Sequence, residues 1–117
     1  MKRILLPVIF IFLLTATVAF AQEQITSGEA KDNIGKTLHV KGKVASVFIS
    51  DKGNKFINFD GKSPNHTFTA AIFSKNDIDI SRIKEGCTLT VYGEIKEYKG
   101  KPEIIIENSE QIISIEE

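Results

Sequence analysis

Apolar and polar residues alternate along most of the chain after residue 36, with the period of two that is typical of strands with one buried face. A first strand is expected over 37–50. Its apolar positions are Leu38, Val40, Val44, Val47 and Ile49. The last two are out of phase with the first three, so we expect a bulge or a strong coil near Gly42–Ser46. An Asp-Lys-Gly-Asn turn at 51–54 follows this strand.

Four further strands follow, separated by turns or loops. They are expected over 55–60, 66–73, 87–98 and 102–108. Lys99-Gly100-Lys101 predicts a tight hairpin between the fourth and fifth strands. The polar segment 74–83 contains three isoleucines and predicts a short helical linker, with a helix or a turn, between the third and fourth strands. A last apolar stretch, 111–115, closes the domain or pairs briefly at an edge.

A short helix is expected in the polar extension 22–36, which precedes the first strand. Thr26 and Glu29 have the spacing of a capping box, and Ala30 and Ile34 lie four residues apart on one helical face. Gly35 would end this helix after two turns at most. Residues 37–117 then form the main domain.

This order of elements is the one that a five-stranded OB-fold barrel requires. A long first strand serves two sheets, a helical segment separates the third and fourth strands, and a tight turn joins the fourth and fifth. The first strand must bend to serve both sheets, and Gly42 permits the bend. The prediction is therefore an all-β OB-fold, with an SH3-like barrel and a short β-sandwich as alternatives.

The first 21 residues have the composition of a secretory signal peptide. Lys2 and Arg3 supply a positive start, an apolar run covers 4–20, and Ala19-Phe20-Ala21 forms a cleavage motif. We therefore expect cleavage before Gln22 and export to the periplasm or the medium. The alternative is a retained membrane anchor, for which the apolar run is at the short end of the necessary length.

The charge of the chain bears on its partners. The whole sequence has 15 basic and 15 acidic residues, so removal of residues 1–21, with Lys2 and Arg3, leaves 13 against 15 and a net charge of −2. Domains that bind nucleic-acid phosphates are usually basic. The distribution is uneven, because 22–76 sums to +3 and 77–117 to −5. This indicates either an ordinary solvated surface or a basic face on the first strands.

Residues suited to catalysis or metal binding are scarce. His39 and His66 are the only histidines, and neither has a cysteine or aspartate at ligand spacing, so we expect no metal site and no cofactor. Cys87 is the only cysteine, which excludes an intrachain disulfide, and we expect it to be a small buried hydrophobe. Asp51 and Asp60 lie in turns, whereas acid–base catalysis needs converging carboxylates. We expect a protein that is not an enzyme.

Several short motifs carry a resemblance to a known family. They are Gly-Lys-Val at 42–44, Phe-Ile-Asn-Phe at 56–59, the run 68–73, Leu-Thr-Val-Tyr-Gly at 89–93, Tyr-Lys-Gly-Lys-Pro at 98–102 and Ile-Ile-Ile at 104–106. Over about 37–115 the chain resembles exported single-domain bacterial OB-fold proteins of the nucleic-acid-binding, tRNA- and helicase-type family.

The resemblance implies a ligand-binding barrel without catalytic activity. In that family the ligand lies across the second and third strands, between the loops that join strands one to two and four to five. By position, the resemblance implies the ligand-binding residues Lys52, Lys55, Phe56, Asn58, Phe68, Tyr98, Lys99 and Lys101.

The aromatic residues of this surface allow two interpretations. Lys55 beside Phe56, and Tyr98 beside two lysines, would offer stacking faces for bases next to charges for phosphates. Alternatively the phenylalanines fill the barrel. Strand alternation puts Phe56 and Asn58 on one face and Ile57 on the other, so at least one of these faces is core.

Two hypotheses of function follow. The first is an exported OB-fold protein that binds single-stranded nucleic acid or another polyanion through the face of the second and third strands. The second is a periplasmic stress-tolerance or adaptor protein that binds a small molecule, a cation or a protein partner. A lysine-lined aromatic face favours the first, and a closed apolar pocket favours the second.

Overall fold

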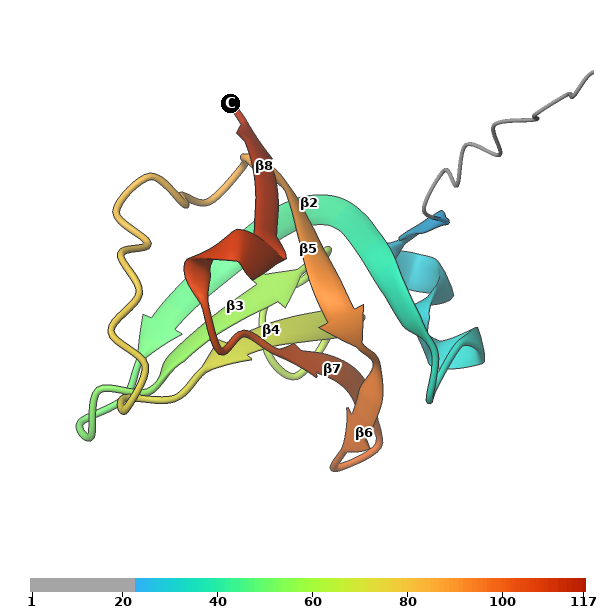
Figure 1. Cartoon of the computed structure of the whole chain (residues 1–117), viewed down its shortest axis with the longest axis horizontal. Helices are drawn as coiled ribbons and strands as arrows, with labels where there is room; N and C mark the ends of the chain where they lie inside the picture. The colour runs from blue at the N-terminus through green and yellow to red at the C-terminus, as the bar shows by residue number, and fades with distance from the viewer. Residues whose placement is uncertain (1–22) are drawn as a thin grey trace, which may run out of the picture.

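The computed structural model describes residues 23–117 (Figure 1). The expected signal peptide, 1–21, lies outside the described residues. Within 23–117 no helix has the length and apolar character needed to cross a membrane.

Strands dominate the described chain, as the alternation predicts. The elements are β1 (Gln24–Thr26), η1 (Ser27–Asp32), β2 (Thr37–Ile49), β3 (Lys55–Phe59), β4 (Phe68–Ile72), β5 (Thr88–Glu94), β6 (Lys96–Tyr98), β7 (Lys101–Ile105), η2 (Ser109–Gln111) and β8 (Ile112–Glu116). The short helix expected before the first strand is the 3-10 helix η1, and the Glu29 carboxylate accepts a hydrogen bond from the Thr26 N–H at 2.9 Å. Ala30 is buried, but Ile34 lies beyond η1 and is exposed.

The strands form one curved sheet in the order β6-β7-β4-β3-β2-β5-β8, with β1 beside β2. Two of its pairings, β1 with β2 and β4 with β7, are parallel, and the others are antiparallel. The five expected strands are β2, β3, β4, β5 and β7. The OB-fold prediction is confirmed, although the expected fourth strand is divided into β5 and β6, and 112–116 forms β8 against β5.

The long strand β2 bends where the sequence predicts it. Residues 37–43 pair with β5 and residues from Val44 onward pair with β3, with a register shift between Val44 and Ser46 (Figure 1). Gly42 lies just before this bulge. A Cβ atom there would lie 2.1 Å from Oγ of Ser27 and 2.9 Å from the ring of Phe59, so the position has no room for a side chain.

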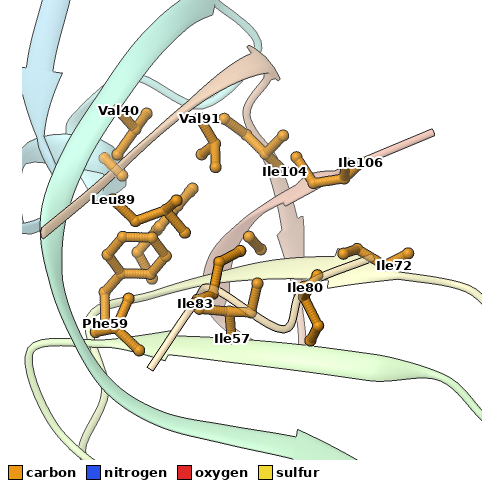
Figure 2. Close-up of a cluster of buried hydrophobic side chains, with 14 of the residues drawn as sticks. Val40, Ile57, Phe59, Ile72, Ile80, Ile83, Leu89, Val91, Ile104 and Ile106 are labelled. Atoms are coloured by element: carbon orange, nitrogen blue, oxygen red, sulfur yellow. The ribbon is translucent and has the colours of Figure 1, made fainter. Parts of the chain in front are cut away.

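The inner face of the sheet holds a single apolar core. Figure 2 shows its side chains converging from β2, β3, β4, β5 and β7. Phe59 and Phe68 are fully buried, with ring centroids 5.0 Å apart in an edge-on arrangement. Cys87 is buried with a free thiol, as expected.

The linker between β4 and β5 corrects one prediction. Residues 73–87 are fully described and contain turns but no helix, so the expected turn is present and the prediction of a helical linker is wrong. Ile78, Ile80 and Ile83 are nonetheless buried against the core, and Figure 2 shows Ile80 and Ile83 beside Ile57. The Asp79 carboxylate accepts the Ser81 N–H at 2.9 Å, a local bond that competes with helix formation.

A side-chain amide bridges the gap between β5 and β7. These two strands do not pair in the described sheet, and Gly93 lets them approach because a Cβ there would lie 2.7 Å from Ile104. The Gln111 amide nitrogen donates to the carbonyl oxygens of Tyr92 on β5 and Ile105 on β7, both at 3.0 Å. Its amide oxygen accepts the Glu107 N–H at 2.7 Å. Gln111 thus replaces the missing strand pairing that would close the barrel.

Candidate functional site

A row of polar side chains crosses the outer face of the sheet. Strand register places Ser46 of β2, Asn58 of β3, Thr69 of β4 and Glu103 of β7 side by side. The Asn58 amide donates to Ser46 Oγ at 3.2 Å and accepts the Thr69 hydroxyl at 2.9 Å. These bonds fix the orientation of the Asn58 amide. Asn58, Thr69 and Glu103 are all buried, although they face away from the core.

An aromatic pair lies next to this row. Phe48 of β2 and Phe56 of β3 are register partners, and their rings are stacked with centroids 6.3 Å apart and planes inclined by 21°. Phe48 is 58% exposed. A large apolar ring that stays in water at the edge of a sheet has a free face for a ligand.

The hairpin between β6 and β7 supplies the facing wall. Tyr98 is 56% exposed, and the Lys99 ammonium lies 5.3 Å from the centre of its ring. Lys101 Nζ donates to the carbonyl oxygens of Pro64, at 2.9 Å, and His66, at 2.6 Å. Lys101 therefore ties this hairpin to the loop between β3 and β4, and its ammonium has one donor left for a ligand.

A groove of about 430 Å³ lies between these two walls. Its lining residues are Phe48, Phe56, Asn58, Ser63, Pro64, His66, Thr69, Tyr98, Lys99, Lys101, Pro102 and Glu103. Its floor is polar and its walls are aromatic. This volume falls within the range of small-molecule binding pockets.

Two titratable groups of the groove are shifted in opposite senses. Burial raises the pKa of the Glu103 carboxyl above its ordinary value. Burial, with a smaller contribution from the Lys101 charge, lowers the pKa of His66. The His66 Nδ1 atom is buried and has no hydrogen-bond partner among the described residues. Both shifts disfavour the charged form, which reflects the limited access of water to the groove.

Five of the eight residues implied by the family resemblance meet in this groove: Phe56, Asn58, Tyr98, Lys99 and Lys101. The other three do not line it.

Phe68 requires a correction, because its side chain is fully buried in the core against Phe59. Lys55 shares the inward-facing parity of Ile57, and its ammonium donates to the Ile78 carbonyl at 2.5 Å. Lys52 is exposed in the turn between β2 and β3, away from the groove.

The sequence interpretation missed Phe48, His66, Thr69 and Glu103 as groove residues. Phe48 had a detectable signal, because beyond the bulge the positions 46 and 48 alternate with the apolar 47 and 49. The sequence also contained a signal for Glu103, because it is the only charged residue in the stretch 102–106, which otherwise holds proline and three isoleucines. Thr69 becomes recognisable only from the register of β4, and His66 only from the position of the loop between β3 and β4.

A second hollow of about 490 Å³ surrounds Asp60 and has a structural explanation. The Asp60 carboxylate accepts hydrogen bonds from the hydroxyl groups of Ser27, at 2.6 Å, and Thr67. These bonds join η1 to the end of β3 and the start of β4. Within 23–117 no group of three His, Cys, Asp or Glu side chains is placed to hold a metal ion.

No curated protein matches the sequence. Among solved structures, a chain assigned as an aspartyl-tRNA synthetase from Leishmania major Friedlin is similar, with a TM-score of 0.55, 12% identity and coverage of 81% of this chain. The present chain spans only 21% of that synthetase chain. An OBody, AM1L10, solved bound to hen egg-white lysozyme, has a TM-score of 0.56 at 14% identity, with 83% of this chain and 94% of that chain covered.

At these identities the two structures show the fold alone. A family model described as "OB-fold nucleic acid binding domain" matches residues 38–112. The matched range runs from β2 to the start of β8 and includes every residue that lines the groove. The chain belongs to the family of OB-fold nucleic-acid-binding domains.

Proposed function

We propose that this protein is a non-enzymatic binding module that takes single-stranded nucleic acid in the groove between the Phe48–Phe56 pair and the β6–β7 hairpin. The observation that carries the proposal is the stacked pair itself, which lies beside a polar floor with Phe48 exposed and Phe56 half-buried. Family membership supports the same class of ligand.

The groove offers what a single strand requires. Phe48, Phe56 and Tyr98 present ring faces, and base–aromatic stacking contributes on the order of 1–3 kcal/mol per base. Lys99 and Lys101 stand at the hairpin wall, where they would contact the sugar–phosphate backbone. Stacking is therefore expected to supply most of the affinity.

Electrostatic contacts with phosphates are expected to supply a smaller part of the binding affinity than stacking does. Two lysines line the groove, while Lys55 is engaged by Ile78 and Lys52 lies elsewhere. For single strands the slope of log K against log salt is about −0.7 per phosphate neutralised, so two contacts predict a slope of roughly −1.4. Weak salt dependence would thus distinguish this groove from a basic nucleic-acid channel.

The test is fluorescence anisotropy of a labelled single-stranded oligonucleotide at low and high salt. Binding at low salt with a shallow salt slope is the expected result. Absence of detectable binding at low salt would overturn the proposal, and a steep slope would place the contact on lysines outside the groove.

A protein partner is the second candidate. An OB-fold chain of similar architecture has been solved bound to lysozyme, and this chain exposes Phe48, Ile49 and Phe73. The net charge of −2 after removal of residues 1–21 also fits an adaptor role better than a phosphate-binding one. Failure of all oligonucleotides to bind, together with capture of one defined periplasmic protein that Phe48→Ala abolishes, would favour this candidate.

We also propose that the protein is exported. The support is the sequence of residues 1–21, with Lys2 and Arg3 before an apolar run and an Ala-Phe-Ala motif. Mass spectrometry of the protein recovered from the periplasm or the medium should find Gln22 at the N-terminus. An uncleaved N-terminus in the membrane fraction would support an anchor instead.

A further inference from the structure

The floor of the groove contains a largely buried glutamate whose carboxylate has no protein partner among the described residues. Glu103 is 8% exposed and lines the groove. Within 23–117 no hydrogen bond or ion pair reaches its side chain, although Lys96 is its register partner on β6. The two carboxylate oxygens are not among the buried side-chain atoms that lack a partner, so they are open to solvent and can accept hydrogen bonds from a ligand.

The other floor groups are already committed. The Thr69 hydroxyl donates to the Asn58 amide oxygen, and the Asn58 amide nitrogen donates to Ser46. The second N–H of the Asn58 amide remains as a donor, and most of the acceptor capacity left at the floor lies in the two Glu103 oxygens, which only accept when ionised. The floor therefore selects for a ligand edge that carries adjacent donors.

We propose that Glu103 makes the groove selective for guanine within a single strand. Guanine carries two neighbouring donors, N1–H and N2–H₂, on its Watson–Crick edge, and they match the two oxygens of a carboxylate. Adenine and cytosine place one amino group beside an acceptor nitrogen, and thymine places one N–H between two carbonyls. Each of these three bases would set an acceptor against a carboxylate oxygen, so the site rejects them as well as favouring guanine.

The placement of the walls fits this role. A base whose ring lies against Tyr98 or Phe56 turns one edge toward the floor, where Glu103 lies. Burial, which raises the pKa of the Glu103 carboxyl, also means that two donors from a ligand would replace hydration that the folded protein has lost. The inference rests on the proposed nucleic-acid function and adds a base preference to it.

Five labelled pentadeoxynucleotides, each with a different central base between flanking thymines, test the inference. The central bases are guanine, hypoxanthine, adenine, cytosine and thymine. Anisotropy at low salt and pH 8, where the carboxylate is ionised, should show the guanine strand binding about tenfold more tightly than the thymine strand. The hypoxanthine strand keeps N1–H but lacks the N2 amino group, so most of the preference should disappear with it.

The matched variants are Glu103→Gln and Glu97→Gln, which remove the same charge. Glu97 is exposed on β6 and does not line the groove. Glu103→Gln should reduce the ratio of guanine-strand to thymine-strand affinity to within about threefold, and Glu97→Gln should keep that ratio. Thermal unfolding of both variants checks that they are folded.

The possible results distinguish a failure of the guanine preference from a failure of nucleic-acid binding itself. If all five strands bind the unaltered protein equally well, or if Glu103→Gln keeps the full preference, the guanine inference is wrong and the nucleic-acid function stands. If no strand binds at all, the proposed function fails and the base preference fails with it.

Discussion

The rings of Phe48 and Phe56 stack at 6.3 Å across neighbouring strands because β2 contains a bulge. The register of β2 shifts between Val44 and Ser46, and the shift moves Val47 toward the core and Phe48 to the outer face. A slip of one residue in a strand exchanges its two faces. The same irregularity that bends the barrel therefore creates the aromatic wall of the groove.

The aromatic wall gives the first prediction. Replacing Phe48, Phe56 or Tyr98 individually with alanine should weaken oligonucleotide binding by about fivefold to a hundredfold, since each substitution removes a stacking face. Anisotropy measures the change. Phe73→Ala is the matched control, because Phe73 is also an exposed aromatic residue but lies outside the groove. Equal losses for Phe73→Ala and Phe56→Ala would contradict the assignment of the site.

The amide bridge across β5 and β7 gives the second prediction. Gln111→Ala removes hydrogen bonds to Tyr92, Ile105 and Glu107, and should lower the free energy of unfolding by about 2 kcal/mol. Urea unfolding measures this loss. Glu110→Ala, at an exposed neighbouring position, should change stability by less than about 0.5 kcal/mol. A similar result for both variants would show that the bridge does not hold the barrel closed.

The bend in β2 gives the third prediction. Gly42→Ala places a Cβ against Ser27 and Phe59 and should destabilise the fold by about 1–3 kcal/mol. Gly28→Ala is the control, because a Cβ at Gly28 has no heavy atom within 4 Å. Differential scanning calorimetry of the two variants should show a lower unfolding temperature only for Gly42→Ala. An unchanged Tm for that variant would mean that Ser27 and Phe59 move aside freely.

Glu103 gives a prediction about pH. Burial raises the pKa of its carboxyl in the folded protein, so the folded state holds this proton more tightly than the unfolded state. The resulting stability is fully present below the ordinary glutamate pKa of about 4.3 and is lost as the pH rises through the raised value. Glu103→Gln should therefore raise the Tm at pH 8, and this advantage should shrink toward pH 4.

The pH measurement compares the variant with the unaltered protein at each pH, so that the contribution of His66 to the pH dependence cancels. Glu97→Gln, an exposed change of the same kind, should give a difference that varies little with pH. If the gain from Glu103→Gln is the same at pH 4 and pH 8, desolvation of the carboxylate is not its cause.

Much of the fold could be predicted from the sequence, because its signals are local. Alternation located the five main strands, and the change of phase after Val44 located the bulge. The prediction of a helix in the linker 74–83 was wrong. The spacing of its isoleucines was compatible with a helix, and their burial against the core is achieved by turns instead. No local signal indicated that Gln111 bridges two strands.

The site was predicted only in part, because it depends on register. Tyr98 and the hairpin lysines were found through a contiguous motif. Phe68 was misplaced because resemblance by position does not say which face of β4 a residue occupies, and its pairing with Phe59 puts it in the core. Glu103 joins the groove through the parallel pairing of β4 with β7, which no short motif encodes.

The most direct test of the account is an NMR titration of the protein with a short single-stranded oligonucleotide at low salt, followed through its backbone amides. The largest shift changes should occur at Phe48, Asn58, Thr69, Tyr98 and Glu103, on five different strands that meet in the groove. Changes centred on the hollow around Asp60 or on β8, or no changes at low salt, would contradict it.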